Sequence, residues 1–265
     1  MHYVIGDVHG HYTCLMDFLE KLNLQKDDVV YFVGDVCDRA PTAKEQADLL
    51  RWCFQNISPD GQFRMVMGNH ELEHLADLQE RFSRPLTKPA DEIKLNDRYG
   101  FFPQCYEQDL TNMEIYRFLQ TLPIFHKLTM DGHDYFITHS WITGENNREF
   151  GGYDEEVNIF DSVWDRHYSV YGTVEEGNFT VIHGHTPTMC DYYYDCNPEI
   201  EPLVIKRKGN INLDCGLFWR QRQDGDLAAY CIETDEVYYL YGEKNKIIDL
   251  SSQEKENSKN SAITK

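Results

Sequence analysis

Hydrophobic positions in the first 70 residues alternate between short continuous runs and helical spacing. The apolar runs at 3–5, 29–33 and 63–67 have the composition of buried strands. Between the first two runs, apolar residues recur over 15–22 at the three- and four-residue intervals of one helix face. Strands that alternate with helices predict βαβ units, and therefore an α/β fold with a largely parallel sheet.

Polar residues and prolines predict where the next helices begin and where the pattern breaks. Thr42 and Glu45 lie three residues apart, as in a capping box, and predict the start of a second helix. A third helix is expected after Gly68. Prolines and charges at 82–108 predict a loop or an insertion, and the pattern at 109–122 predicts a further helix.

The second half of the chain predicts mostly strands and loops. Asp131-Gly132 lies between two apolar runs and predicts a hairpin. Residues 144–178 are acidic and contain several glycines, so we expect solvated loops there. The polar segment 251–265 predicts a disordered tail, which leaves residues 1–250 as one expected α/β domain. Later strands, the last four of them antiparallel, are predicted at 179–182, 203–205, 211–213, 227–232 and 237–240.

The composition is that of a globular protein with an acidic surface. The chain has 265 residues, with 25 Lys plus Arg and 45 Asp plus Glu, so its formal charge is −20. Such a surface repels nucleic-acid duplexes and anionic membranes, and no apolar run is long enough to predict a membrane span. Eight scattered cysteines without a CxxC pair, and an N-terminus without a basic or apolar leader, predict reduced thiols and a cytoplasmic protein.

Five apolar runs end in residues that can bind metals or transfer protons. In α/β sheets, ligands bind beyond the carboxyl ends of the strands, so these residues are expected to converge in one crevice. The separations of the first three motifs match one βαβ unit each. In chain order the runs are followed by Gly6-Asp7-Val8-His9-Gly10, Gly34-Asp35-Val36-Cys37-Asp38-Arg39, Gly68-Asn69-His70-Glu71, His139 and His183-Gly184-His185.

The residue types at these strand ends predict a metal site. Six mixed oxygen and nitrogen ligands exceed what one zinc ion takes and suit two ions that share a carboxylate. Imidazole together with carboxylate favours manganese, iron or zinc over calcium. The six candidate ligands are Asp7, His9, Asp35, Asn69, His139 and His185.

The ordered motifs GDVHG, GDVCDR and GNHE, followed by His139 and by GHT at 184–186, resemble the metallo-dependent phosphatases of the phosphoprotein phosphatase type. These belong to the calcineurin-like phosphoesterase superfamily. Bacterial serine/threonine protein phosphatases and diadenosine tetraphosphate hydrolases share the motifs. The resemblance implies a metallophosphatase fold, in which a central β-sandwich is flanked by helices and a dinuclear metal site lies at the carboxyl ends of the strands.

The resemblance also assigns a role to each motif residue. His70 is the expected general acid, Asp38 orients it, and Arg39 and Arg166 bind phosphate oxygens. The family usually has glycine where this chain has Ala40, and a left-handed backbone would be strained there. Of the metal ligands, the resemblance places Asp7 and His9 on the first ion, Asp35 between both ions, and Asn69, His139 and His185 on the second.

The expected activity is hydrolysis of phosphate monoesters by a hydroxide that bridges two divalent ions, manganese being the expected metal and iron or zinc the alternatives. A serine/threonine protein phosphatase is the first interpretation. The alternative is a hydrolase of dinucleoside polyphosphates or nucleotides, for which Tyr192–Tyr194 could stack on a base, although ring packing is the simpler account of those tyrosines. A non-catalytic binding module with the same fold is the third. His74, His126, His133 and His167 have no motif around them and receive no role.

Overall fold

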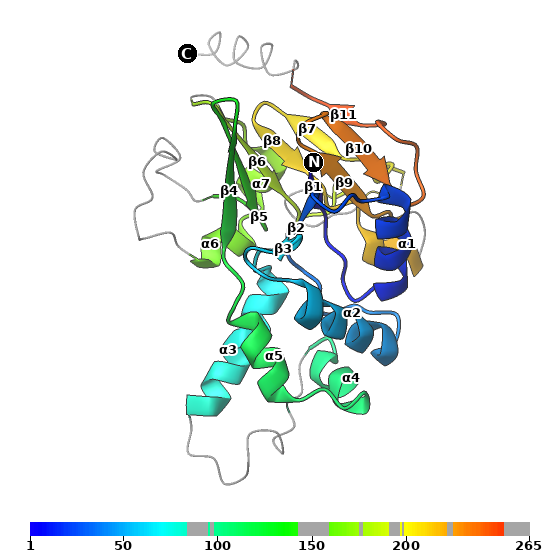
Figure 1. Cartoon of the computed structure of the whole chain (residues 1–265), viewed down its shortest axis with the longest axis vertical. Coiled ribbons are helices and arrows are strands. Elements are labelled where there is room, and N and C mark those ends of the chain that lie inside the picture. Colours follow the sequence, from blue (N-terminus) through cyan, green and yellow to red (C-terminus); the bar gives the residue numbers. More distant parts are fainter. Residues whose placement is uncertain are drawn as a thin grey trace.

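Two mixed β-sheets face each other in the computed structural model, with helices packed outside them (Figure 1). The structure describes residues 1–83, 95, 98–142, 159–174, 177–190, 197, 199–221 and 225–251. Nearly all of the predicted tail, the tyrosines at 192–194 and parts of the two predicted loop regions lie outside the described residues. Within the described part, the α/β sandwich with flanking helices is confirmed.

The first sheet contains strands from both the N-terminal and the C-terminal part of the chain. Its three N-terminal strands are parallel, as the sequence predicts, but two C-terminal strands extend it in antiparallel orientation. The antiparallel strands predicted at 227–232 and 237–240 are therefore confirmed. In order across the sheet the strands are β10 (Glu236–Tyr239), β9 (Ala228–Cys231), β1 (His2–Ile5), β2 (Val29–Phe32) and β3 (Phe63–Met65).

The second sheet is also mixed. Its β4–β5 pair is the predicted hairpin, and Asp131 and Gly132 turn the chain at φ of 50° and 77°. Strands β5, β6 and β8 run parallel to one another, whereas β7 and β8 are antiparallel. In order across the sheet the strands are β11 (Ile248–Asp249), β7 (Ile205–Arg207), β8 (Asn210–Asn212), β6 (Phe179–His183), β5 (His133–Thr138) and β4 (Phe125–Met130).

Alternate side chains along the strands of the first sheet lie in two separate hydrophobic cores. Ile5 and Phe32 pack on the helix side of this sheet, whereas Val4 and Tyr31 point into the space between the sheets. Both faces are therefore buried, which explains why these runs are continuously apolar in the sequence. This double packing fixes the strands from both sides, and with them the loops at their carboxyl ends.

Seven α-helices surround the described sheets, and Figure 1 shows α2 to α5 gathered at one end of the molecule. Three of them correct the prediction, because α4 lies in the segment predicted as a loop or an insertion, and α6 and α7 lie in the segment predicted as solvated loops. The predicted helix at 109–122 is shorter than expected. The helices are α1 (Tyr12–Leu22), α2 (Ala43–Asn56), α3 (Asn69–Ser83), α4 (Phe101–Glu107), α5 (Asn112–Leu119), α6 (Ile159–Trp164) and α7 (His167–Tyr171).

The start of α2 differs from a full capping box. The Thr42 side chain accepts a hydrogen bond from the Glu45 backbone N–H at 3.2 Å, as predicted. The Glu45 carboxylate, however, accepts hydrogen bonds from the backbone and the hydroxyl of Thr13. Glu45 thereby links α2 to α1 instead of closing the box on Thr42.

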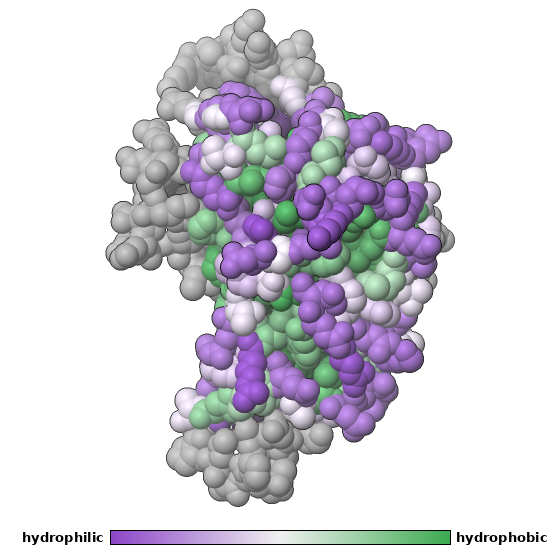
Figure 2. Space-filling view, in the orientation of Figure 1, coloured by the Kyte–Doolittle hydropathy of each residue, from purple (hydrophilic) through white to green (hydrophobic). Residues whose placement is uncertain are grey.

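Polar residues cover most of the face seen in Figure 2, and apolar residues collect in its central band. In the described part of the chain, every helix is too short or too polar to cross a bilayer. Cys190 forms a disulfide, so the prediction of reduced thiols throughout is wrong at that position. The cysteines that remain free thiols are Cys14, Cys37, Cys53, Cys105, Cys215 and Cys231.

Candidate metal centre

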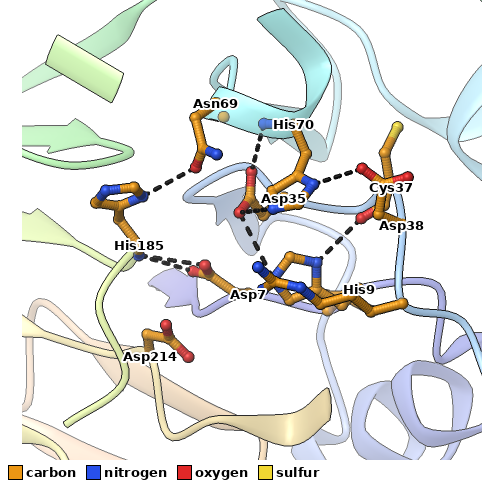
Figure 3. Close-up of polar contacts among 12 residues, drawn as sticks. Asp7, His9, Asp35, Cys37, Asp38, Asn69, His70, His185 and Asp214 are labelled. Atoms are coloured by element: carbon orange, nitrogen blue, oxygen red, sulfur yellow. Dashed lines mark hydrogen bonds and ion pairs between the residues drawn. The ribbon is translucent and has the colours of Figure 1, made fainter. Parts of the chain in front are cut away.

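The predicted ligands converge where the carboxyl ends of strands from both sheets meet. Asp7 and His9 follow β1, Asp35 follows β2, and Asn69 opens α3 just after β3. From the second sheet, His139 follows β5 and His185 follows β6. Figure 3 shows the side chains of Asp7, His9, Asp35, Asn69 and His185 pointing toward one another. Each is at most 4% exposed, so the cluster is buried.

Asp35 lies at the middle of this cluster. Its Oδ1 is 3.4 Å from His139 Nε2, and its Oδ2 is 3.5 Å from His9 Nε2 and 3.8 Å from His70 Nε2. Two sets of potential ligand atoms include Asp35. In one set the atoms come from His9, Asp35 and His70, and in the other from Asp7, Asp35 and His139. Within each set, all atoms lie within 4.8 Å of one another. Asp35 belongs to both sets, as a bridging carboxylate would.

Backbone carbonyls orient two of the imidazoles for metal binding. His9 Nδ1 lies 3.0 Å from the Cys37 carbonyl, and His139 Nδ1 lies 2.8 Å from the Val33 carbonyl. Because a carbonyl only accepts, both Nδ1 atoms donate, and each Nε2 carries a lone pair. At His139 this lone pair faces Asp35 Oδ1 without a shared hydrogen, and a cation between the two acceptors would satisfy both, whereas the lone pair of His9 accepts a hydrogen from Arg39.

The other half of the cluster brings three polar atoms close together. Asn69 Oδ1 lies 2.9 Å from both His139 Nε2 and His185 Nδ1, and these two nitrogens are 3.2 Å apart. Burial lowers the pKa of both His139 and His185, so the imidazoles are neutral. Neutral imidazole is the form that binds metals. The residues therefore fit a divalent metal pair.

Three buried carboxylates share this site, one more than predicted. Burial and the charges of Asp214 and Asp35 raise the pKa of Asp7, and burial raises the pKa of Asp214 to about 7. Bound cations would relieve this repulsion. Asp214 is not among the predicted ligands, although it follows the apolar run at 211–213 as the other site residues follow theirs.

Several site residues have strained backbones. Positive φ in a residue other than glycine costs about 1–2 kcal/mol, and such strain collects at functional sites. Ala40 is not among these residues, so alanine in place of the family glycine causes no strain of this kind there, and its side chain packs beside Gly10. Half of the ten such residues in the described chain are predicted site residues: His9 (45°), Asp35 (52°), Asp38 (66°), Arg39 (60°) and His185 (74°).

Two motif glycines are required because a carboxylate of the site lies too close to leave room for a side chain. A Cβ on Gly184 would lie 1.9 Å from Asp7 Oδ1, and a Cβ on Gly68 would lie 2.2 Å from Asp35 Oδ1. Both contacts are shorter than any side chain tolerates. Glycine at these positions therefore lets one strand end approach the carboxylate that follows another.

The Glu71 side chain binds the backbone of the loop after β2. Its Oε1 accepts the backbone N–H groups of Val36 and Cys37 at 3.0 Å each, and its Oε2 accepts those of Asp35 at 2.7 Å and Gly68 at 3.0 Å. The four donors use all four acceptor positions of one carboxylate. Burial and the Asp35 charge raise the pKa of Glu71, and these amides oppose the rise.

The predicted general acid lies beside its predicted partner. His70 Nδ1 hydrogen-bonds to Asp38 Oδ2, and both side chains are buried. Burial opposes protonation of His70, but the charges of Asp35 and Asp38 outweigh it and raise the pKa of the imidazole. His70 Nε2 faces the metal ligands, which is the side on which a substrate would bind.

The two predicted phosphate-binding arginines reach the site from different directions. Arg39 Nη1 donates to His9 Nε2 at 2.8 Å, and its guanidinium lies 4.3 Å from the centre of the Phe218 ring. Arg166 Nη1 donates to Thr186 Oγ1 at 3.0 Å, next to His185. Both cations therefore lie beside residues of the cluster.

Comparison with known protein sequences identifies relatives for part of the chain. A symmetrical bis(5'-nucleosyl)-tetraphosphatase from Yersinia pestis (strain Pestoides F) is 36% identical over 92 residues, which is 34% of this chain and 29% of the relative. The corresponding enzyme of Yersinia pseudotuberculosis matches equally. The match thus spans under a third of the length of these relatives.

Solved structures share the fold over nearly the whole chain. A candidate diadenosine tetraphosphatase has a TM-score of 0.54 at 17% identity, covering 90% of this chain and 91% of that one. A Saccharomyces cerevisiae protein serine/threonine phosphatase has a TM-score of 0.54 at 14% identity, covering 93% and 80%. The family model for calcineurin-like phosphoesterases matches residues 3–214, which include every predicted site residue. The chain therefore belongs to the calcineurin-like phosphoesterase family.

Proposed function

We propose that the protein hydrolyses phosphate esters at a pair of divalent metal ions held by the buried cluster. The observation that carries the proposal is the pair of facing acceptors at the centre of the cluster, where the lone pair of the neutral His139 imidazole and the Asp35 carboxylate lie 3.4 Å apart with no hydrogen to share. Asp7 and His9 would hold one ion, and Asp35 would bridge both. The second ion would be held by Asn69, His139 and His185.

The ligand set favours manganese, with iron or zinc as alternatives, because imidazole and carboxylate together suit these metals. When bound, the ions supply Lewis acidity, which makes water a stronger nucleophile and neutralises phosphate charge. Arg39 and Arg166 would bind the phosphate oxygens, since a guanidinium matches two such oxygens at once. These two cations also offset the net charge of −20 near the substrate.

His70 would protonate the leaving group. As water adds its oxygen to phosphorus and releases one proton to solvent, the bond from phosphorus to the ester oxygen breaks, and that oxygen keeps the electron pair. The proton on His70 Nε2 then moves to the ester oxygen, so an alcohol leaves instead of an alkoxide. The Asp38 carboxylate stabilises the charged imidazole before this transfer and holds its ring.

The direct test is turnover of p-nitrophenyl phosphate by the purified protein with added manganese. The matched control is Asp35→Asn, which keeps the shape of the bridging residue and removes its charge. We expect about two equivalents of bound transition metal and turnover that the control lacks. Equal rates in both proteins would refute the proposal, and less than one equivalent of metal without turnover would favour the non-catalytic binding module.

Two substrate classes remain candidates. Solved structures of both classes share the fold over at least 90% of this chain, and the tetraphosphatase relatives also match in sequence over 92 residues. We propose phosphomonoesters, phosphoproteins among them, as the first class and dinucleoside polyphosphates as the second. Relative kcat/KM for a phosphoserine peptide and for diadenosine tetraphosphate, with analysis of the nucleotide products, decides between them.

We also propose a reducing compartment such as the cytoplasm. Six described cysteines are free thiols, which supports this location. The disulfide at Cys190 is the observation against it. Mass spectrometry of alkylated protein from freshly lysed cells would decide, because a fully alkylated chain supports a reducing compartment and a protected Cys190 contradicts it.

A further inference from the structure

A buried histidine outside the motifs, His74, contacts the residue that orients the proposed general acid. His74 Nε2 lies 3.0 Å from Asp38 Oδ2, the same oxygen to which His70 Nδ1 is bonded. His70 and His74 lie four residues apart in α3, so their imidazoles leave the same face of the helix. All three side chains are buried.

The hydrogen positions in this group follow from the chemistry of the carboxylate. Burial opposes ionisation of Asp38, but the hydrogen bonds from both histidines lower its pKa to about 2. An ionised carboxylate only accepts, so each nitrogen that faces it must carry a hydrogen. His70 Nδ1 therefore carries a hydrogen. The other ring nitrogen, Nε2, lies 3.8 Å from Asp35 Oδ2 and faces the candidate metal centre.

A single donor would leave the Asp38 carboxylate poorly fixed, because the terminal torsion of aspartate is broad. Asp38 Oδ1 is buried and has no hydrogen-bond partner among the described residues. The backbone gives little help, since Asp38 has a φ of 66° in a strained turn. Two donors on Oδ2, both from α3, hold the plane of the carboxylate relative to His70.

The surroundings of His74 would otherwise suit an apolar residue. Its ring stacks on Phe101 with centroids 4.1 Å apart and planes 12° apart, and Phe102 meets it edge-on at 5.1 Å. His74 Nδ1 is buried without a partner in the described part of the chain, which costs free energy. The hydrogen bond to Asp38 is the contact that offsets this cost.

We propose that His74 is a positioning residue that fixes the Asp38 carboxylate and, through it, the imidazole of His70. The inference rests on the proposed function, because the aim of His70 matters only when a leaving group must be protonated. His74 itself does not touch the substrate. Its loss should therefore slow esters with poor leaving groups far more than esters with good ones.

Two aryl esters of similar shape separate proton donation from the other steps. Phenyl phosphate releases a basic phenolate that needs a proton, whereas p-nitrophenyl phosphate releases a stabilised anion that needs little help. His74→Phe keeps a ring beside Phe101 and removes the donor. We expect kcat to fall about 10–100-fold on phenyl phosphate, the range for loss of a residue that orients a site group, and far less on p-nitrophenyl phosphate.

Two further variants act as controls. His74→Gln carries an amide N–H at about the reach of the imidazole Nε2, so it should recover most of the loss on phenyl phosphate. Glu73→Gln alters the exposed neighbour on α3 and should leave both rates unchanged. If His74→Phe does not fold, His74→Asn carries the same expectation, because its shorter amide stops short of Asp38.

A double variant tests whether His74 acts through His70. In the His70→Asn background, His74→Phe should cause no further loss on phenyl phosphate, because the group that it positions is gone. Equal losses on the two esters, or a further loss in this background, would overturn the inference. A wild-type protein inactive on both esters would refute the proposed function instead, so the two failures are distinguishable.

Discussion

Glu71→Gln should destabilise the protein strongly, although it changes one atom of a fully buried side chain. Each carboxylate oxygen of Glu71 accepts two backbone N–H groups from the loops around Asp35 and Gly68. In glutamine, one of these oxygens becomes an NH₂ group, which donates and cannot accept. Whichever way the amide is turned, two backbone N–H groups lose their acceptor.

The expected cost follows from that count. A buried donor left without an acceptor costs about 1–3 kcal/mol, so two such donors give about 2–6 kcal/mol of lost unfolding free energy. This is a large part of the 5–15 kcal/mol that typically stabilises a domain. Because Asp35 lies in the released loop, the variant should also bind less manganese than the parent.

Urea unfolding of the metal-free proteins measures this cost, and an unchanged slope against urea shows that the unfolded state is comparable. Glu73→Gln is the matched control, because Glu73 is exposed on the same helix and should lose less than about 0.5 kcal/mol. A loss below about 1 kcal/mol in Glu71→Gln would refute the reasoning. It would mean that water or a small backbone shift satisfies the two amides.

Three further predictions concern other parts of the chain. Burial opposes ionisation of Asp28, but hydrogen bonds from the N-terminal amine and a backbone amide lower the pKa of its carboxyl. The ionised carboxylate therefore stabilises the fold at neutral pH, and this stabilisation is lost as pH falls below about 3.8. At pH 7, the melting temperature of Asp28→Asn should lie below that of the exposed control Asp27→Asn, and this difference should disappear in acid. A difference in melting temperature that stays constant with pH contradicts the prediction. Gly184→Ala should displace Asp7, so elemental analysis should find one equivalent of manganese or less, and two retained equivalents would exclude that displacement. Thr42→Ala should cost about 1 kcal/mol of unfolding free energy in thermal melts, and no measurable change would rule out the cap.

The strand ends of the site could be predicted because their signal is local. An apolar run followed by glycine and an acidic or amide residue marks Asp7, Asp35 and Asn69 before any tertiary contact is known. Asp214 has the same signal after its run, without the glycine, and was missed. Glu71 belongs to such a motif and His74 does not, but the role of neither could be predicted, because it depends on the loop after β2, which only the fold brings to α3.

The helices that the prediction missed have physical explanations of the same kind. Pro103 suggested a loop, but it lies in the first turn of α4, where its missing N–H has no partner to lose. Phe101, Phe102 and Cys105 are buried along that helix and stabilise it by packing. The strands at 227–232 and 237–240 could be predicted from their own pattern, but their pairing with β1 could not, because it joins residues from opposite ends of the chain.

The pairing of β1 with β9 also constrains how the chain is assembled during synthesis. Tyr3 lies opposite Cys231, so the second edge of β1 stays open until almost the entire polypeptide has left the ribosome. The parallel strands β1, β2 and β3 can associate early, but an uncovered edge invites pairing with other nascent chains. Truncation upstream of β9 should therefore yield insoluble aggregates and not a smaller folded unit.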